Sequence, residues 1–306
     1  MKNLIAIVGP TGVGKSRLAL QTAEKFNGEI INADSRQVYR YMNIGTAKPL
    51  PEELAHVPHH LINIIDPDED FSLAQFQKLA RRAISGVFRR DRLPVLVGGT
   101  GQYAWAVLEG WQIPKVAPDL DLRRKLEKIA AEGGGEALYK QLVETDPVSA
   151  QKIDKNNIRR LIRALEVLSR ANESSYKLRG KKEPGFMSLI IGLTASREEL
   201  YRRVDARVDE MIERGFIEEV KELITMGYGL GLPAVSSVGY RQIGEYLNGA
   251  VSLEDEVKKI KTETHRVIRH QYAWFRLSDI RIRWFDVEKV SDKEILELVA
   301  RFLKQN

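Results

Sequence analysis

Hydrophobic positions in the first third of the chain alternate between short continuous runs and helical stripes. Three apolar runs that end at glycine or polar residues predict buried strands, at residues 3–9, 28–33 and 93–101. Three stretches with apolar residues three or four positions apart predict amphipathic helices, at residues 15–26, 71–90 and 102–110. Alternating helices and continuously apolar strands predict an α/β fold, with a parallel sheet covered by helices on both faces.

The hydrophobic pattern changes after Gly110. Helical stretches follow one another without a strand signal until residues 187–194, and they occupy residues 119–132, 136–144 and 157–170. We therefore expect an inserted all-helical domain at residues 113–186, between the two parts of an α/β core at residues 1–112 and 187–306. Beyond the strand at 187–194, the pattern predicts long helices at 196–215 and 253–277 and a last strand at 281–287.

The composition is that of a soluble globular protein, with 306 residues, 43% hydrophobic and 29% charged. The absence of cysteine excludes disulfides, thiolate metal sites and a cysteine nucleophile. No apolar run approaches the roughly 20 residues of a membrane-spanning helix, and the N-terminal run is too short for a signal peptide. We expect a cytoplasmic protein without membrane contact and, because no dimer seam is evident, a monomer.

Most of the net charge of +6 lies in the middle of the chain. Residues 113–186 contain 16 Lys/Arg and 11 Asp/Glu, a net charge of +5. Such a local excess fits a polyanionic partner, and it also fits a solvated helical surface.

One helix of this basic segment has two distinct faces. Its expected buried stripe is Ile158, Leu161, Ile162, Leu165 and Leu168. The opposite face is expected to carry Arg159, Arg163, Glu166 and Arg170, with Arg160 beside them. That face suits a phosphate backbone or plain solvent. Basic and aromatic residues also recur in the helix at 253–277, where we expect Trp274 and Phe275 to be core residues rather than base-stacking platforms.

The stretch GPTGVGKS, residues 9–16, matches the P-loop pattern G-x-x-x-x-G-K-[ST] between a predicted strand and a predicted helix. The loop predicts a phosphate or diphosphate site, with Lys15 supplying a charge and Ser16 a hydroxyl for Mg²⁺. The motif does not identify the molecule that carries the phosphate.

The acidic residue that usually holds the metal in P-loop hydrolases and kinases is not evident. The predicted strand at 93–101 ends in Gly-Gly-Thr, and Asp66 is followed by Pro67. Asp34 follows the predicted strand at 28–33, where it could hold a metal, accept a proton or cap a helix. Thr100 could contact phosphate, metal or substrate, or it could simply form a turn.

Motifs from nearly the whole chain, in order from Leu4 to about Arg276, resemble the tRNA dimethylallyltransferase (tRNA isopentenyltransferase) family. They read GPTGVGKS, NADSRQVYRYMNIGTAKP, PHHLINIIDPDEDFSLAQF, LVGGTGQYAWAVLEG, IRRLIRALEV, GFIEEV, SSVGYRQIGEYLNG and HQYAWFR. The resemblance implies a P-loop-NTPase-like core with a helical insertion that binds tRNA. It also implies transfer of a dimethylallyl group from dimethylallyl diphosphate to N6 of the adenosine 3′ of the anticodon, position 37, with release of diphosphate.

The same resemblance implies roles for individual residues. Asp34 is the expected general base, with Lys15 and Thr100 also in the catalytic set, and Ser16 holds the Mg²⁺ cofactor. The diphosphate, in place of ATP, is expected to contact Gly9, Pro10, Thr11, Gly12, Val13, Gly14, Lys15, Ser16 and Arg207. The adenosine is expected to be flipped out of the anticodon loop. The expected tRNA contacts are Asp34, Ser35, Arg36, Gln37, Thr100, Arg123, Arg159, Arg160, Leu161, Ile162, Arg163, Ser236, Ser237, Val238, Gly239, Tyr240, Arg241, Arg269, His270, Gln271 and Arg276.

The chain departs from the family pattern in two places. It carries Arg-His-Gln at 269–271 where the family usually has Lys-Arg-Gln, so His270 replaces a permanent charge. Because the sequence has no cysteine, we also expect it to lack the zinc-finger extension of some eukaryotic relatives. Two other functions fit the same P-loop and basic residues. One is a small-molecule or nucleoside kinase, and the other is a nucleic-acid-binding ATPase.

Overall fold

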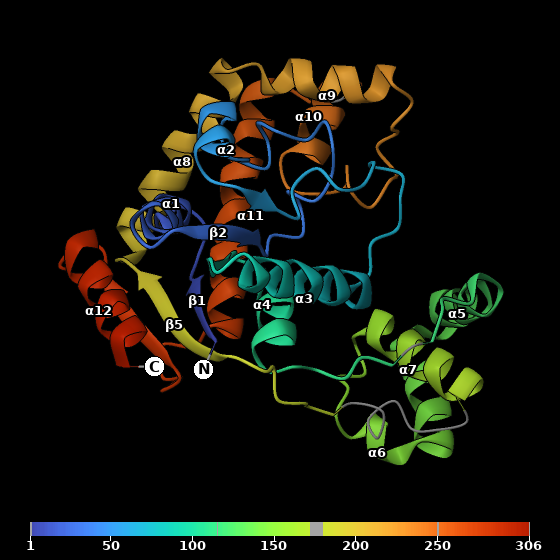
Figure 1. Ribbon diagram of the computed structural model, residues 1–306. Helices are drawn as coiled ribbons and strands as arrows, with labels where there is room; N and C mark the ends of the chain where they lie inside the picture. Colours follow the sequence, from blue (N-terminus) through green and yellow to red (C-terminus); the bar gives the residue numbers. More distant parts are fainter. Residues whose placement is uncertain (1, 115, 172–179, 250, 306) are drawn as a thin grey trace. The chain divides into compact units, whose positions relative to one another are not determined.

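The chain forms two separate units in the computed structural model, which describes residues 2–114, 116–171, 180–249 and 251–305 (Figure 1). The first, called here the core unit, comprises Met1–Leu108 and Pro184–Asn306. The second, called here the helical unit, comprises Glu109–Glu183.

A six-stranded parallel sheet is the centre of the core unit, in the order β3-β2-β4-β1-β5-β6. The strands are β1 (Asn3–Val8), β2 (Gly28–Asn32), β3 (His59–His60), β4 (Leu93–Val97), β5 (Met187–Thr194) and β6 (Ile282–Asp286). Ile5 of β1 is in register with Val95 on one side and Leu189 on the other. Because all strands run in the same direction, the loops after β1, β2 and β4 emerge at one edge of the sheet, where parallel α/β proteins bind ligands.

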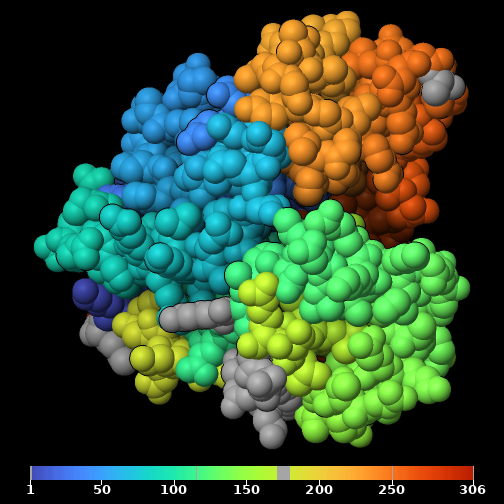
Figure 2. All heavy atoms as spheres, turned by 90° about the vertical axis from the view of Figure 1, so that its right-hand side faces the viewer, coloured from blue at the N-terminus to red at the C-terminus, as the bar shows by residue number. Residues whose placement is uncertain are grey.

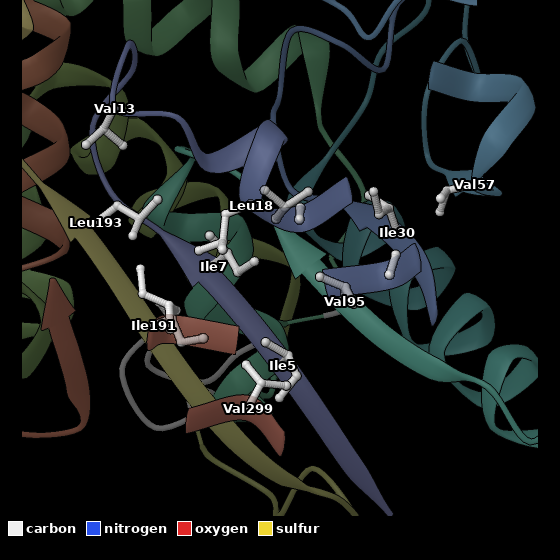
Figure 3. Close-up of a cluster of buried hydrophobic side chains, with 14 of the residues drawn as sticks. Ile5, Ile7, Val13, Leu18, Ile30, Val57, Val95, Ile191, Leu193 and Val299 are labelled. Atoms are coloured by element: carbon white, nitrogen blue, oxygen red, sulfur yellow. The ribbon is translucent and has the colours of Figure 1, made fainter. Parts of the chain in front are cut away.

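Helices cover both faces of this sheet, as the strand pattern predicted. Ile5, Ile7 and Ile191 point into a hydrophobic cluster on one face (Figure 3). The helices that contribute side chains to this cluster include α1 (Lys15–Lys25), α8 (Arg197–Glu213) and α12 (Asp292–Gln305). Leu4 and Ala6, at the alternate positions of β1, are equally buried beneath the other face. That face is covered by α3 (Leu73–Arg89) and α4 (Gly101–Leu108).

A second hydrophobic cluster of the core unit joins the loop region after β2 to the end of α8 and to three further helices. These are α9 (Phe216–Thr225), α10 (Tyr240–Leu247) and α11 (Leu253–Trp274). The short helix α2 (Pro51–His56) also lies between β2 and β3. Figure 2 shows the blue surface of this loop region directly against the orange surface of the helices. Phe216 and Tyr240 meet edge to face at its centre, with ring centroids 5.0 Å apart. This cluster gives the loops above the sheet a rigid support.

The helical unit consists of α5 (Leu120–Thr145), α6 (Pro147–Ala150) and α7 (Ile158–Ala171). The expected break at the glycine triplet is present, because Gly134 interrupts α5 with a φ of 67°. Leu138, Leu142 and Leu161 are fully buried in the core of the unit. Ile158 was expected in the buried stripe, but it is 37% exposed because it lies at the first position of α7. None of the helices formed by the described residues combines the length and apolar composition needed to cross a membrane.

Candidate active site at the carboxyl edge of the sheet

A cavity of about 710 Å³ opens in the core unit where β1, β2 and β4 end. Its walls come from the P-loop, from residues 32–37 and 45–49, from the glycine-rich turn after β4, and from α8 and α11. The loops therefore bring Lys15, Asp34 and Thr100 around one space, as expected from the strand ends.

The P-loop takes a shape that favours glycine at three of its positions. Gly9 and Gly12 have φ values of 139° and 81°, and Gly14 has a φ of 100° where it caps the start of α1. A Cβ on Gly9 would also lie 2.4 Å from the carbonyl oxygen of Leu193. Val13 packs into the sheet core, 1% exposed, so only its main chain is available to an anion. The N-terminus of α1 faces the cavity, an arrangement that favours negative charge.

Two partly buried cations, Lys15 of the P-loop and Arg207 of α8, lie at this end of the cavity. Lys15 Nζ donates to the carbonyl oxygen of Pro10 at 2.7 Å, and Arg207 donates to Thr11 Oγ1 at 2.7 Å. Burial lowers the pKa of Lys15 to about 8, while Asp34 favours the charged form and Arg207 disfavours it. Burial likewise lowers the pKa of Arg207, against the attraction of Asp34. Each cation is disfavoured without an anion nearby, so the site is electrostatically prepared to receive one.

Asp34 is held in place by its neighbour Asn32. The Asn32 side chain accepts from the Asp34 amide at 3.0 Å and donates to the carbonyl oxygens of Asp34 and Leu61 at 3.2 and 3.1 Å. The Asp34 carboxylate accepts from the amide of Arg36 at 2.8 Å. A helix-capping role for Asp34 is wrong, because no helix begins in the described loop before Pro51. The proton-acceptor and metal-ligand alternatives both remain open to this carboxylate.

Thr100 ties the loop of Asp34 to the end of β4. Its hydroxyl accepts from the amide of Ser35 at 3.0 Å and donates to Ser35 Oγ at 3.2 Å. Its own amide donates to the carbonyl oxygen of Ala33 at 3.3 Å. Gly98 is required for this approach, because a Cβ there would lie 2.2 Å from that carbonyl. Thr100 therefore positions the segment that carries Asp34, and it also lines the cavity.

The donor set for a cation is small. The described residues contain no group of three or more His, Cys, Asp or Glu side chains that could hold a metal ion. The exposed hydroxyl of Ser16 and the carboxylate of Asp34 line the same cavity. This set fits Mg²⁺, which usually takes one or two protein oxygens and completes its shell with water and substrate phosphates.

The far wall of the cavity is one face of α11. Gln271 on this face accepts from the Thr11 amide at 2.7 Å and donates to the carbonyl oxygen of Gly99 at 3.1 Å. Its side-chain amide therefore reaches into the site instead of toward solvent. His270 and Trp274 line the cavity beside it. Trp274 is 37% exposed, so the expectation that it is a core residue is wrong; Phe275 is buried as expected.

Glu219 fixes the main chain next to the part of the cavity wall formed by residues 45–47, called here the roof. The sequence patterns did not single out this glutamate. Its buried carboxylate accepts from the amides of Asn43, Ile44 and Gly45 at 2.8, 2.7 and 3.1 Å. It also accepts from the Tyr240 hydroxyl at 2.6 Å. Glu219 lies within the GFIEEV motif, and a glutamate at helical spacing from Phe216 and Leu223, on the apolar face of the helix, was the available signal.

The other residues of this region have mixed placements. Arg36 donates to the carbonyl oxygen of Pro233 at 3.0 Å, and Gln37 donates to the carbonyl oxygens of Thr46 and Ala47. Among the expected tRNA contacts at 236–241, Ser237, Val238 and Gly239 line the cavity, and Ser236 and Arg241 are exposed. Tyr240 is fully buried, so its side chain has a structural role and no surface for RNA. Arg269 donates to the Tyr201 hydroxyl at 2.9 Å, and Arg276 is exposed.

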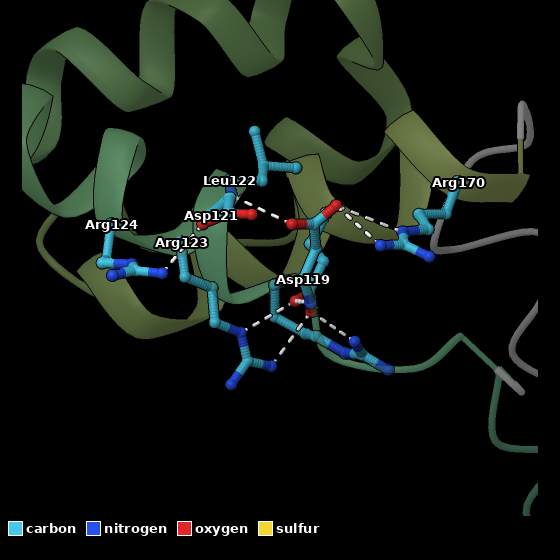
Figure 4. Close-up of polar contacts among 8 residues, drawn as sticks. Asp119, Asp121, Leu122, Arg123, Arg124 and Arg170 are labelled. Carbon is cyan, nitrogen blue, oxygen red and sulfur yellow. Dashed lines mark hydrogen bonds and ion pairs between the residues drawn. The ribbon is translucent and has the colours of Figure 1, made fainter.

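Two arginines of the helical unit, Arg123 and Arg163, pair with Glu166, and Figure 4 shows Arg123 near the neighbouring pair of Arg170 and Asp119. The Glu166 carboxylate is fully buried and accepts from Arg123 at 2.8 and 3.0 Å, from Arg163, and from the Asp119 amide at 2.7 Å. Burial raises its pKa, but these hydrogen bonds outweigh burial and hold the pKa below its ordinary value. Arg170 pairs with Asp119 at 2.8 Å. The expectation that Glu166 lies on the exposed face with the arginines is therefore wrong.

The expected RNA-contacting segment 159–163 divides between surface and core. Arg159 and Arg160 are exposed, and Arg163 is partly exposed. Leu161 and Ile162 are 0% and 6% exposed within the core of the helical unit, so their side chains offer no surface to RNA. The helical period places these two residues on the apolar side of α7, as the buried stripe required.

Comparison with known proteins identifies the family. Residues 37–278 match the family model described as IPP transferase, and residues 2–63 match the one described as isopentenyl transferase. The chain is 47% identical over 300 residues to the tRNA dimethylallyltransferase of Dehalococcoides mccartyi, covering 98% of this chain and 92% of the relative. It is 52% identical over 273 residues to that of Roseiflexus sp. RS-1, covering 89% and 90%.

Solved structures agree with the sequence comparison. The tRNA isopentenylpyrophosphate transferase of Bacillus halodurans matches with a TM-score of 0.74 and 41% identity, over 100% of this chain and 98% of that one. A eukaryotic dimethylallyltransferase acting on tRNA matches with a TM-score of 0.83 and 28% identity, over 100% of this chain and 80% of that one. The chain therefore belongs to the tRNA dimethylallyltransferase family, enzymes that transfer a dimethylallyl group to tRNA.

Proposed function

We propose that this protein transfers the dimethylallyl group of dimethylallyl diphosphate to N6 of the adenosine 3′ of the anticodon. The observation that carries the proposal is the shared cavity, in which a P-loop and two partly buried cations lie near one carboxylate. In this reaction the bond from the allylic carbon to the diphosphate oxygen breaks, a bond to N6 forms, and one N6 proton must leave.

The P-loop is the site for the leaving diphosphate. Main-chain amides at the N-terminus of α1, together with Lys15 and Arg207, stabilise negative charge as it develops on the departing oxygen. Ser16, with Asp34 nearby, is suited to hold a Mg²⁺ ion that neutralises diphosphate charge when bound.

Asp34 is the proton acceptor in this proposal. The exocyclic amine of adenine is a weak nucleophile, and removal of a proton as it attacks makes the new bond favourable. Its carboxylate attracts Lys15 and Arg207 and lines the same cavity as the P-loop. The acceptor base must leave the stacked anticodon loop to reach this carboxylate.

Apolar residues of the same cavity suit the five-carbon donor. Val208 and Met211 of α8, Phe216 of α9, and Ile260 and Val267 of α11 line it. An apolar wall excludes water from an electron-poor allylic carbon, which water would otherwise capture.

The anticodon stem-loop is the proposed RNA partner. Exposed Arg159 and Arg160 on α7 supply phosphate contacts in the helical unit. Exposed Arg269, His270 and Arg276 supply contacts at α11 and just beyond its end in the core unit. Such charges position RNA, while the pocket for the flipped base selects adenosine.

Mass spectrometry of a synthetic anticodon stem-loop tests the proposal. After incubation with dimethylallyl diphosphate and Mg²⁺, the RNA should gain one C5H8 unit at the adenosine 3′ of the anticodon. A matched stem-loop with guanosine at that position should stay unmodified. A small-molecule or nucleoside kinase, the alternative reading of the P-loop, would instead consume ATP and leave the RNA mass unchanged.

A further inference from the structure

Thr11 of the P-loop forms hydrogen bonds with side chains from two helices. Arg207 of α8 donates to its hydroxyl at 2.7 Å, and Gln271 of α11 accepts from its main-chain amide at 2.7 Å. An amide that donates to Gln271 does not donate to a phosphate. The anion site of the P-loop is therefore formed by the amides that follow Thr11. Gln271 fixes the position of the main chain just before them.

The other end of the Gln271 side chain is equally committed. Its Nε2 donates to the carbonyl oxygen of Gly99 at 3.1 Å. A Cβ on Gly99 would lie 2.1 Å from that nitrogen, so the amide group fills the space above the glycine. Gly99 lacks a positive φ, and this contact, not backbone strain, is what opposes a side chain there. Gln271 thus bridges the loops that follow β1 and β4.

The helix that carries Gln271 is anchored on both sides of it. The Tyr272 hydroxyl is 2.7 Å from Thr194 Oγ1 at the end of β5. The Trp105 indole of α4 donates to the carbonyl oxygen of Trp274 at 3.0 Å. These contacts fix the backbone around Gln271. Its side chain can therefore hold the P-loop in place instead of moving with it.

We infer that Gln271 is a positioning residue for the diphosphate-binding loop and does not contact RNA. It holds the Thr11 main chain against the Gly99 turn, so that the remaining amides of the P-loop are set in place before the diphosphate arrives. The inference rests on the proposed role of the P-loop as the diphosphate site. It differs from the expectation that Gln271, with Arg269 and His270, forms part of the tRNA-binding surface.

Binding of inorganic pyrophosphate and of the stem-loop to the full-length protein separates the two roles. In Gln271→Ala, the Kd for pyrophosphate in Mg²⁺ and the KM for dimethylallyl diphosphate should rise about tenfold, because the partly buried Thr11 amide loses its acceptor. The Kd for the stem-loop should stay within about twofold of the parent. Arg266→Ala is the control on α11, because that exposed arginine pairs with Glu263 of its own helix; it should change none of these constants.

A second variant tests the bridge from its other end. Gly99→Ala pushes the Gln271 amide away and should weaken pyrophosphate binding by a similar factor. Both substitutions remove the same bridge. The double variant should therefore bind pyrophosphate about as tightly as the single variant with the lower affinity. Fully additive losses, or a stem-loop Kd raised about tenfold with pyrophosphate binding unchanged, would overturn the inference. This test compares the pyrophosphate Kd of each variant with that of the parent. The proposed function is tested separately, by C5 transfer with the parent protein.

Discussion

The carboxylate of Glu166 lies fully buried and accepts two hydrogen bonds from the guanidinium of Arg123, at 2.8 and 3.0 Å. Because Arg163 donates to the same carboxylate, one acid fixes two of the arginines expected to meet RNA. The basic face of the helical unit is therefore a prearranged surface and not a set of independent side chains.

Glu166→Gln should destabilise the helical unit and weaken RNA binding together. Loss of the charge leaves Arg123 and Arg163 close together without their counter-ion, and both are about one-third exposed, which reduces the cost to about 2–3 kcal/mol. Urea unfolding followed by circular dichroism measures it. Glu136→Gln removes an exposed pair with Lys155 in the same unit and should leave the unfolding midpoint nearly unchanged. Equal midpoints for the two variants would contradict the role of Glu166.

Asp34→Asn should abolish most transfer while leaving binding intact. The amide keeps the size of the side chain but accepts no proton, and general bases contribute roughly 10²–10⁴-fold to a rate. Single-turnover transfer to the stem-loop measures the chemical step, and pyrophosphate and stem-loop titrations measure binding. A variant that transfers at the parental rate would remove Asp34 as the base. One that loses pyrophosphate affinity in Mg²⁺ would support the metal-ligand role instead.

Affinity for the diphosphate donor should fall as the pH rises through about 8. Burial lowers the pKa of Lys15 to about 8 in the free site, so the ammonium loses its charge above that pH. A bound anion favours the charged lysine, and binding above pH 8 must therefore be accompanied by proton uptake. The Kd for dimethylallyl diphosphate measured between pH 7 and pH 9.5 shows the effect. Lys15→Arg, which stays charged throughout, should give a flat profile; parallel profiles would assign the titration to another group.

Arg159→Ala combined with Arg160→Ala should weaken binding of the stem-loop and reduce its salt dependence. Both side chains are exposed on α7. Each lost phosphate contact removes about 0.7–0.9 from the slope of log K against log salt. Lys128→Ala, an 80% exposed lysine of α5, is the control for loss of a charge alone. If the double variant keeps the parental slope, this part of α7 is a solvated surface.

Local patterns were sufficient to predict five of the six strands that the described residues form, and the position of the P-loop between β1 and α1. The strands at β1, β2 and β4 are continuously apolar, and the P-loop glycines follow β1 directly, so both signals lie within a few neighbouring residues. Strand β3 has two residues, His59 and His60, too few to show a period. Helix α12 was missed although Ile295 and Val299 carry a helical spacing in the sequence.

Residues whose roles depend on tertiary contacts were not predictable in the same way. A helical wheel places Glu166 beside arginines, and only the packing of α5 on α7 shows that this side of the helix is buried. Gln271 appears in sequence as one more polar residue of a basic segment. Its contacts with Thr11 and Gly99 join residues 260 and 172 positions apart, beyond the reach of any local pattern.

Glu219→Gln should impair transfer through the cavity roof. A glutamine has one carbonyl oxygen where three main-chain amides and the Tyr240 hydroxyl now find two carboxylate oxygens. We expect a raised KM for dimethylallyl diphosphate, because Gly45, Thr46 and Ala47 line the donor cavity. Glu218→Gln is the matched control, since that neighbouring glutamate is exposed. Identical kinetics in the two variants would show that the carboxylate is not needed.

The hydrogen bonds between Glu219 and the main chain also affect which residues of this protein can change during evolution. Glu219 binds the main-chain amides of residues 43 and 44, whatever side chains these residues carry. The shape of the roof therefore depends on a residue about 175 positions further along the chain. Gly45 is the exception, because a Cβ there would lie 2.2 Å from the Phe216 ring. Natural variation is therefore expected to be permitted at 43 and 44, opposed at 45, and linked between 45, 216 and 219.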